Sequence, residues 1–437
     1  MNWATRGVQF EVRAYRLFPG GCDIAAATAS ALRHRRMDNV THSLFGYALA
    51  RAVPTSLAES PAKRRALAWT AVVASNIPDA DFVVGAFAHD AKLAYLVHHR
   101  GHTHTLAFAL PLGLAVAAAC ARLARVDAGR DRLHVLLLGA AACLLHVLFD
   151  SFNNYGVHPF FPFDNRWYYG DFVFIIEPLL LAAMLPLLVH GAATRAARML
   201  GWALSLGLLF VLWRTTVWVP RELAFTLAGV VLLCLGAGRA VRIGGRGTLM
   251  AVAAVLVVFA VASRIATTRI RAELARQAPA ERVLDVATTP FPGNPLCWSA
   301  QVVSRDAGGV YRARLASLTL APTWFSTDAC RVMPRGPITA PLRGADLTGS
   351  PALSFGGMFE GDVSALRALA ARSCTAAALL RFVRVPYWTR DDARGVLGDL
   401  RYDSRPEIEF AEMPVGGPCR DWLPGWTPPR ADLLRGR

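Results

Sequence analysis

The sequence predicts an all-α polytopic membrane bundle of seven or eight hydrophobic helices, followed by a smaller soluble α+β domain. The first observation is composition: the 437 residues are 54% hydrophobic and only 18% charged, whereas a soluble domain usually carries about 25% charged residues. The second is that apolar residues gather in runs long enough to cross a bilayer. The third is that these runs stop near residue 266, where a more polar sequence begins.

Seven apolar segments approach the roughly 20 residues that a spanning helix needs. They cover residues 66–87, 104–123, 133–150, 173–191, 199–218, 222–239 and 248–266. A shorter apolar segment at 40–53 is marginal in length, and we expect it to be partly inserted at most. The chain therefore divides into a membrane domain at 37–266 and a soluble domain at 267–437. Residues 1–36 lack the apolar core of a secretory signal, and we interpret them as a disordered extension or a wrongly assigned start.

Clusters of Lys and Arg orient the bundle, because basic loops stay on the cytoplasmic side. Such clusters lie at 63–65, 122–132, 195–198 and 239–246. The alternate loops then face outward, and the last span delivers the soluble domain to the periplasm. We expect a multi-pass protein of a bacterial inner membrane, in contact with membrane lipids. The net charge of +16 is attributed to these loops and to an Arg-rich composition, so no nucleic acid partner is expected.

The soluble domain has the cysteine pattern of an exported domain. Its four cysteines suit two disulfides, for which three pairings are possible. They are Cys297, Cys330, Cys374 and Cys419. The predicted elements are strands at 297–304 and 310–320 around the hairpin signal RDAGG, a helix at 363–381, and strands at 382–388 and 394–402. The domain contains no His, so the candidate chemistry lies in the membrane domain.

Histidines and acids cluster at the predicted outer ends of the helices. All eleven His residues lie in the first 190 positions, and ionisable residues beside membrane spans are functional candidates by default. The clusters are Asp38 with His42, Asp79 with Asp81, the run His98-His99-Arg100-Gly101-His102-Thr103-His104, and His146 with Asp150. The predicted topology brings all of them to one face of the membrane, so we expect their side chains to meet.

The spacing within these clusters suits a cation site. His146 and Asp150 are four residues apart, so they share one helix face. Asp79 and Asp81 lie beside Pro78, which breaks the helix and allows both carboxylates to converge. Neutral imidazoles together with carboxylates suit zinc, and paired carboxylates would allow a second ion nearby. The residue types alone leave open a metal or proton transporter, and also a non-catalytic membrane protein whose zinc clamps the helices.

Several motifs resemble those of the YdjM-type inner-membrane metal-dependent hydrolases. The resemblance rests on MDNVTHSLFGYALAR, NIPDADFV, HRGHTHTLAFAL, HVLFDSFNNYG and PFFPFDNRWYYGDFVFIIEP. It covers residues 37–180 strongly and the rest of the chain loosely. The family is similar in ligand pattern to zinc-dependent phospholipase C and the related zinc nucleases, which use three zinc ions.

The resemblance implies roles for individual residues. The implied metal ligands are His42, Asp79, His99, His104, His146 and Asp150, with Asp81 as a ligand or a supporting catalytic group. Arg100 would face substrate oxyanions, and Glu177 would be a general base or would support the ligands. The implied cofactor is one to three Zn²⁺ ions or another divalent metal. The implied activity is hydrolysis of an amphiphilic substrate at the outer face of the membrane, and a lipid phosphoester is our first hypothesis.

Overall fold

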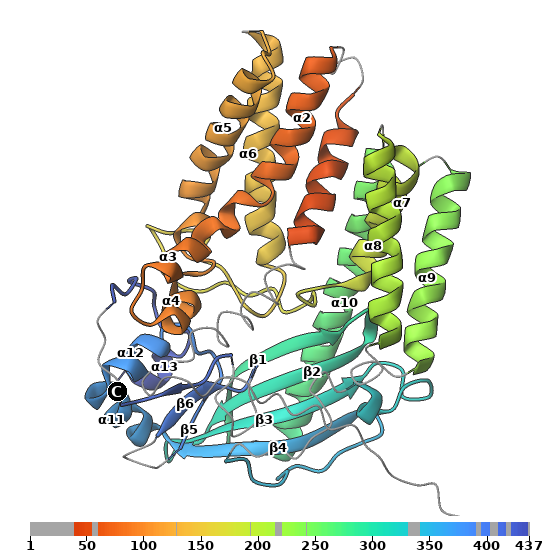
Figure 1. Cartoon of the computed structure of the whole chain (residues 1–437). Coiled ribbons are helices and arrows are strands. Elements are labelled where there is room, and N and C mark those ends of the chain that lie inside the picture. The colour runs from red at the N-terminus through yellow and green to blue at the C-terminus, as the bar shows by residue number, and fades with distance from the viewer. Residues whose placement is uncertain are drawn as a thin grey trace, which may run out of the picture.

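The structure is a computed structural model, and it describes most of the chain after residue 38. The described residues are 39–54, 60–127, 129–192, 194–214, 221–241, 243–330, 341–389, 395–402, 410–416 and 421–435. The proposed N-terminal extension, residues 1–36, lies outside them. In Figure 1 the long helices stand together on one side of the molecule, and the β-sheets lie across their ends. A helical region is thus followed by an α+β region, as predicted.

Helices account for nearly all of the described residues before 278. Residues 39–52 form the first helix. Then follow α2 (Pro61–Ala74), η2 (Ile77–Phe82), α3 (Val83–Ala86), α4 (Ala91–His98), η3 (His102–His104), α5 (Leu106–Leu123), α6 (Arg130–Asp150), α7 (Pro178–Gly191), α8 (Arg195–Arg214), α9 (Arg221–Ala240) and α10 (Gly245–Gln277). α2, α5 and α6 pack in one group, and α7 to α10 pack in another (Figure 1). The first helix contacts both groups, because Gly46 lies against Ala71 of α2 and Leu44 shares a core with α7.

Three of the described helices, α5, α6 and α10, are long and apolar enough to cross a membrane. Shorter apolar helices cover Pro178–Gly191 and Ala224–Ala240. The predicted number of seven or eight spans is therefore not confirmed, although each predicted segment contains a helix. The apolar segment predicted at 66–87 is interrupted near Pro78, as the sequence indicated, since α2 ends at Ala74 and η2 begins at Ile77. The Asn76 amide donates to the carbonyl of Val72 at 2.7 Å, and Pro78 has no N–H with which to continue an α-helix.

Two glycines allow α5 and α6 to approach closely. A Cβ added to Gly113 would lie 2.4 Å from the carbonyl oxygen of Gly139, and one added to Gly139 would lie 2.6 Å from that of Gly113. Small residues at such a crossing let two backbones meet, which is how membrane helices gain packing energy. This crossing fixes α6, which carries His146 and Asp150, against the helix that follows His104.

The C-terminal region is built on two antiparallel sheets. The first has the order β1 (Arg282–Phe291), β2 (Asn294–Arg305), β3 (Val310–Thr319), β4 (Leu353–Asp362), and the second the order β5 (Pro386–Trp388), β6 (Val396–Asp399), β7 (Met413–Pro414). Its helices are η4 (Thr327–Cys330), α11 (Val363–Arg372), α12 (Cys374–Leu379) and α13 (Ala431–Leu434). The predicted β2–β3 hairpin is confirmed. The predicted helix at 363–381 is divided at Ser373, whose side chain caps α12.

The long helix α10 joins the two regions. Its first half is part of the membrane group, and its second half packs on the first sheet, where Ile270 and Leu274 share a core with Trp298. Because these residues bury a continuous apolar face, α10 continues to Gln277 and does not stop near residue 266. The boundary between the two predicted domains is therefore bridged by one rigid element.

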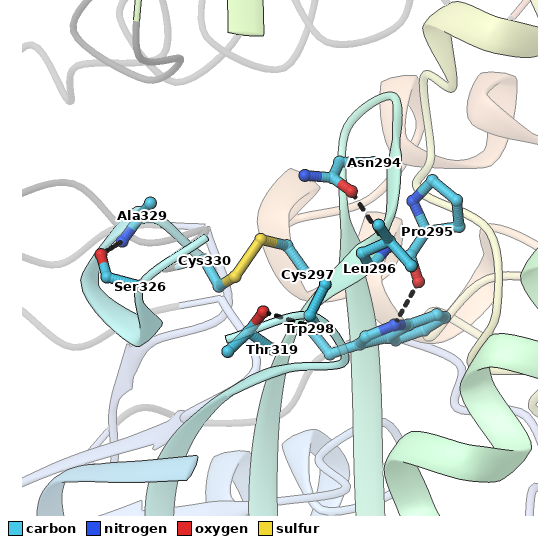
Figure 2. The surroundings of a disulfide bond; sticks show 10 residues. Asn294, Pro295, Leu296, Cys297, Trp298, Thr319, Ser326, Ala329 and Cys330 are labelled. Carbon is cyan, nitrogen blue, oxygen red and sulfur yellow. Dashed lines mark hydrogen bonds between the residues drawn. A yellow bond between two sulfur atoms is a disulfide. The ribbon is translucent and has the colours of Figure 1, made fainter. Parts of the chain in front are cut away.

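A disulfide fixes the end of the first sheet that contacts the helices. Cys297, at the start of β2, is bonded to Cys330 at the end of η4 (Figure 2). Both cysteines are buried with Phe291 and with Leu227 of α9. Cys374 is also disulfide-bonded, which agrees with the prediction of paired cysteines in this domain, while Cys419 lies outside the described residues.

Candidate metal centre

Four side chains converge where the predicted clusters meet. Asp79 comes from η2, His104 from η3, and His146 and Asp150 from the last turns of α6. One ligand atom from each lies within 4.8 Å of all the others. The segments are brought together because η2 packs against α5, α6 and η3. The predicted convergence of these clusters is therefore present in the structure.

The distances within this four-residue group match those around a small cation. The Nε2 atoms of His104 and His146 are 3.1 Å apart. Asp150 Oδ2 lies 3.0 Å from His104 Nε2 and 3.4 Å from His146 Nε2. Asp79 Oδ1 lies 3.4 and 3.6 Å from the same two nitrogens. Tetrahedral ligands at zinc–ligand distances of 2.0–2.2 Å are about 3.3 Å from one another, so the group fits zinc.

Hydrogen bonds on the outer side of each ring direct Nε2 toward the centre. His146 Nδ1 lies 2.7 Å from the carbonyl oxygen of Ser75, which can only accept, so this nitrogen carries the proton. His104 Nδ1 lies 3.3 Å from Asp81 Oδ2. In neutral rings with protonated Nδ1 atoms, both Nε2 lone pairs point inward. Metal-binding histidines are commonly held by such carbonyl and carboxylate partners.

Asp81 organises the segment that surrounds the centre without joining the four donors. Its carboxylate accepts the backbone N–H of Arg100 at 2.8 Å and the Thr103 hydroxyl at 3.1 Å. It also pairs with His99 Nδ1 at 2.9 Å. Burial opposes ionisation of Asp81, but His99 and His104 together hold its pKa below the usual value. Asp81 thus lies beside the four-donor group in contact with His104, and its predicted role as a ligand or a supporting group stays a prediction.

His42 and Arg100 lie on the other oxygen of Asp150. His42 Nε2 is 3.2 Å from Asp150 Oδ1, and its ring is 4.0 Å from that of His146. Arg100 Nη2 is 3.0 Å from the same oxygen, and its Nη1 donates to the Asn153 side chain at 2.9 Å. The guanidinium is buried, so its predicted contact with substrate stays a prediction. In the structure, Arg100 pairs with Asp150 and holds its carboxylate in place.

His99 and Glu177 lie apart from the four-donor group. His99 pairs with Asp81 and stacks on Tyr95 at 4.7 Å. Glu177 caps α7 by accepting from Leu179 N, and it also accepts from Gly293 N in the β1–β2 turn. Burial raises the pKa of Glu177 to about 8. Its side chain is therefore mainly neutral at pH 7 where it links the start of α7 to the β1–β2 turn. The predicted roles of His99 as a ligand and Glu177 as a base are not tested by these contacts.

The C-terminal domain covers the His98–His104 run with aromatic rings. Trp426 donates from Nε1 to the carbonyl of Val97 at 2.7 Å and stacks 3.9 Å from His158. Trp422 stacks on His98 and His102 at 5.1 and 5.6 Å. Burial lowers the pKa of His158 to about 3, so this ring stays neutral in its aromatic setting. Sequence reasoning missed this cover, because no local signal links residues more than 300 positions apart.

Two further supporting groups escaped the sequence analysis in part. The carbonyl of Ser75 cannot be predicted from residue type, since any residue offers one. Asn153 lies three residues after the end of the HVLFD motif, and asparagine is common in turns, so its residue type gives no separate signal for a supporting role. Its side chain accepts from Arg100 and from the backbone N–H of Tyr155, so it links the loop after α6 to the centre.

Comparisons with known proteins concern mainly the helical region. Residues 37–221 match the family described as YdjM inner membrane protein. The chain is also similar to the uncharacterized protein YfhP of Bacillus subtilis (strain 168), at 28% identity over 151 residues. That match covers 34% of this chain and 44% of YfhP, so it spans less than half of the relative. No solved structure matches the chain.

Proposed function

We propose that this protein is a membrane-bound, metal-dependent hydrolase acting at the outer face of the inner membrane, on a lipid phosphoester. The observation that carries the proposal is a group of two imidazole nitrogens and two carboxylate oxygens. The two nitrogens lie 3.0–3.6 Å from each other and from the oxygens, and all four atoms lie within 4.8 Å of one another. The match of residues 37–221 to an inner membrane protein family supports the location. Two Asp and two His form a donor set that suits zinc.

The residues of the chain would share the work as follows. Asp79, His104, His146 and Asp150 would hold the ion. A bound zinc ion lowers the pKa of a water molecule toward ~7 and polarises the group that is cleaved. Arg100 occupies Oδ1 of Asp150, so Oδ2 stays directed to the ion. Asp79 is the most accessible of the four donors, with a side chain that is 12% exposed, and its edge is where a substrate would approach.

The outer location is supported by the C-terminal domain. Figure 1 shows α3 and α4 at the end of the bundle nearest to that domain, and Asp79 and His104 belong to the short helices that come just before α3 and just after α4. The domain contains the Cys297–Cys330 disulfide, and disulfides persist in oxidising compartments such as the periplasm. A phosphatase fused after the last residue should be active only if the domain is exported, and a fluorescent fusion that matures only in the cytoplasm should stay dark.

A non-catalytic zinc clamp is the second candidate, and the low exposure of the donors favours it. His104, His146 and Asp150 are 0–2% exposed, and closed sites with four protein ligands are typically structural. The transporter alternative has less support, because apolar clusters fill α2, α5 and α6 away from the centre. Their members include Ala66, Leu67, Ala117, Ala121 and Val135.

The deciding experiment uses the full chain purified in detergent and returned to phospholipid vesicles. The metal is removed with a chelator, and zinc is restored in steps while headgroup release from long-chain phospholipid is measured. A hydrolase loses turnover without metal and regains it with zinc. A clamp shows no turnover at any zinc level, yet its unfolding temperature falls when the metal is removed. Turnover that persists in the chelated protein would contradict the proposal.

A further inference from the structure

An apolar surface lies on the segment that carries Asp79 and Asp81. Phe82, Val83, Val84 and Phe87 are 45, 45, 41 and 84% exposed, and we name these four residues the 82–87 patch. Between Asp81 and His89 the sequence is FVVGAFA, without a charged or hydrogen-bonding side chain. An exposed group of this kind on a soluble surface would be unusual and would indicate an interaction site.

The patch continues a surface that lipid must cover. η2 packs against α5, one of the three candidate spans. Leu106, Phe108 and Leu110 at the start of α5 are 43–49% exposed. Figure 1 places α3 beside that end of α5. Since the exposed side of a spanning helix contacts acyl chains, the patch extends the same apolar surface past the end of the helix.

The patch has a defined limit at His89. The backbone N–H groups of His89 and Asp90 donate to the Asp421 carboxylate at 2.7 and 2.9 Å. From there α4 runs beneath the C-terminal domain, and it contacts α12. The chain therefore leaves the apolar surface where polar partners first become available. A short apolar segment with polar contacts at its end can lie in the bilayer interface with its apolar side chains inserted.

The patch is also next to the accessible edge of the metal centre. Asp79, the most exposed of the four donors, belongs to the same 3₁₀ helix as Phe82. The other side of the His98–His104 run is covered by Trp422 and Trp426. The least covered side of the centre is therefore the side that carries the patch.

We infer that the 82–87 patch is inserted into the outer leaflet and that the centre receives its substrate from the bilayer rather than from water. The ligand class is an amphiphile whose chains stay among the lipids while its polar group reaches Asp79. The part about substrate rests on the proposed function, whereas the part about insertion does not.

Photocrosslinking of the full chain in phosphatidylethanolamine and phosphatidylglycerol vesicles tests the insertion. Benzoylphenylalanine is placed at 87, at 108 in α5 as the lipid-facing control, and at 343 as the water-facing control. Arg343 is 68% exposed and pairs with Glu360 of β4, the edge strand of the first sheet that lies opposite β1 and farther than β1 from α5 and α6 (Figure 1). Lipid adducts are then measured by mass spectrometry. We expect lipid adducts at positions 87 and 108 and none at position 343. Adducts at 108 alone would overturn the inference.

The turnover rate of the Phe87→Ser variant tests separately whether the substrate enters from the bilayer. A long-chain phosphatidylglycerol in vesicles and a short-chain, water-soluble phosphatidylglycerol serve as the two probes. We expect the variant to lose rate on the vesicles and to keep the rate of the unaltered protein on the soluble probe. An equal loss on both probes would overturn entry from the bilayer. If the unaltered protein cleaves neither probe, the proposed function fails, and the adducts still decide whether the patch is inserted.

Discussion

Two buried groups of charges in this molecule are satisfied in opposite ways. In the first group, between the C-terminal domain and the helical region, Asp171, Asp285 and Asp399 are each met by an arginine. Arg384 donates two bonds of 2.7 Å to Asp171 and bonds of 2.8 and 3.0 Å to Asp285, while Arg401 pairs with Asp399 at 2.7 Å. In the metal centre, by contrast, the acids Asp79 and Asp150 face imidazole nitrogens.

The comparison indicates which of the two groups has its buried charges balanced without a bound ion. Buried carboxylates are costly unless they are paired and hydrogen-bonded. The arginine pairs meet that requirement within the protein. Around the centre, Asp79, Asp81 and Asp150 bring three negative charges, and Arg100 contributes one guanidinium. Because the imidazoles are arranged as neutral donors, a divalent cation would balance the remaining charge.

The largest expected effect is loss of metal on replacing one donor. Asp150→Asn keeps the shape of the side chain but removes its charge, so bound zinc should fall from about one ion per chain to background. Asp399→Asn is the matched control, because it removes an equally buried carboxylate from an arginine pair. Metal analysis of both purified variants makes the comparison. Zinc retained in the first variant, or lost equally from both, would show that the two groups do not differ as argued.

The next effect concerns stability. Arg384→Met leaves Asp171 without the arginine with which it pairs and leaves Asp285 with Arg430 at 3.7 Å, and an unpaired buried charge typically costs about 3–5 kcal/mol. We expect a large decrease in the unfolding temperature of the metal-loaded protein, with zinc content unchanged in the folded fraction. Calorimetry of the variant beside the unaltered protein measures the first quantity. Unchanged stability would mean that this pair does not hold the two regions together.

A smaller effect is expected for the carboxylate that supports the ligands. Asp81→Asn weakens its bonds to His99 and His104 and leaves all four donors in place. Loss of such a supporting partner usually lowers metal affinity about 10–100-fold. Competition with a chromophoric chelator measures the affinity. Complete loss of zinc, equal to that of Asp150→Asn, would instead make Asp81 a ligand.

A fall in pH should affect the metal centre before it affects the arginine–carboxylate pairs. Zinc must compete with protons for its imidazoles, whose usual pKa is about 6.5, so the metal should leave between about pH 6 and 5. Burial opposes ionisation of Asp285, but Arg384 lowers its pKa to about 2. A lowered carboxyl pKa gives stability that is complete above the unfolded value of about 3.9 and is lost toward pH 2. Zinc release and unfolding followed in one titration should therefore occur in that order, and simultaneous transitions would contradict it.

The smallest effect should come from Glu177→Gln. Because burial raises the pKa of Glu177 to about 8, its side chain is mainly neutral at pH 7, and glutamine can still accept from Leu179 and Gly293. We expect stability and zinc content to stay within the error of measurement. If Glu177 is instead a general base, turnover should fall about 10²–10⁴-fold.

Much of the fold follows from local sequence, and the centre follows from topology. Runs of apolar residues predicted where the helices lie. The alternation of basic loops predicted that the His and Asp clusters meet at one end of the bundle. These clusters contain His42, Asp79, His104 and Asp150. Pro78 indicated a break in the helix, but the sequence did not reveal that α2 ends as early as Ala74 or that α10 continues to Gln277. β1 and β4 were also missed, since their residues lack strict alternation. The contacts of Arg384 and Trp426 with the helical region depend on tertiary packing alone.

X-ray absorption at the zinc edge of the loaded, full-length protein tests the central claim most directly. We predict two imidazole nitrogens and two carboxylate oxygens at about 2.0–2.2 Å from the zinc ion. In His146→Ala the imidazole signal should be reduced. A first shell containing sulfur at about 2.3 Å, or a protein that takes up no divalent metal, would contradict it.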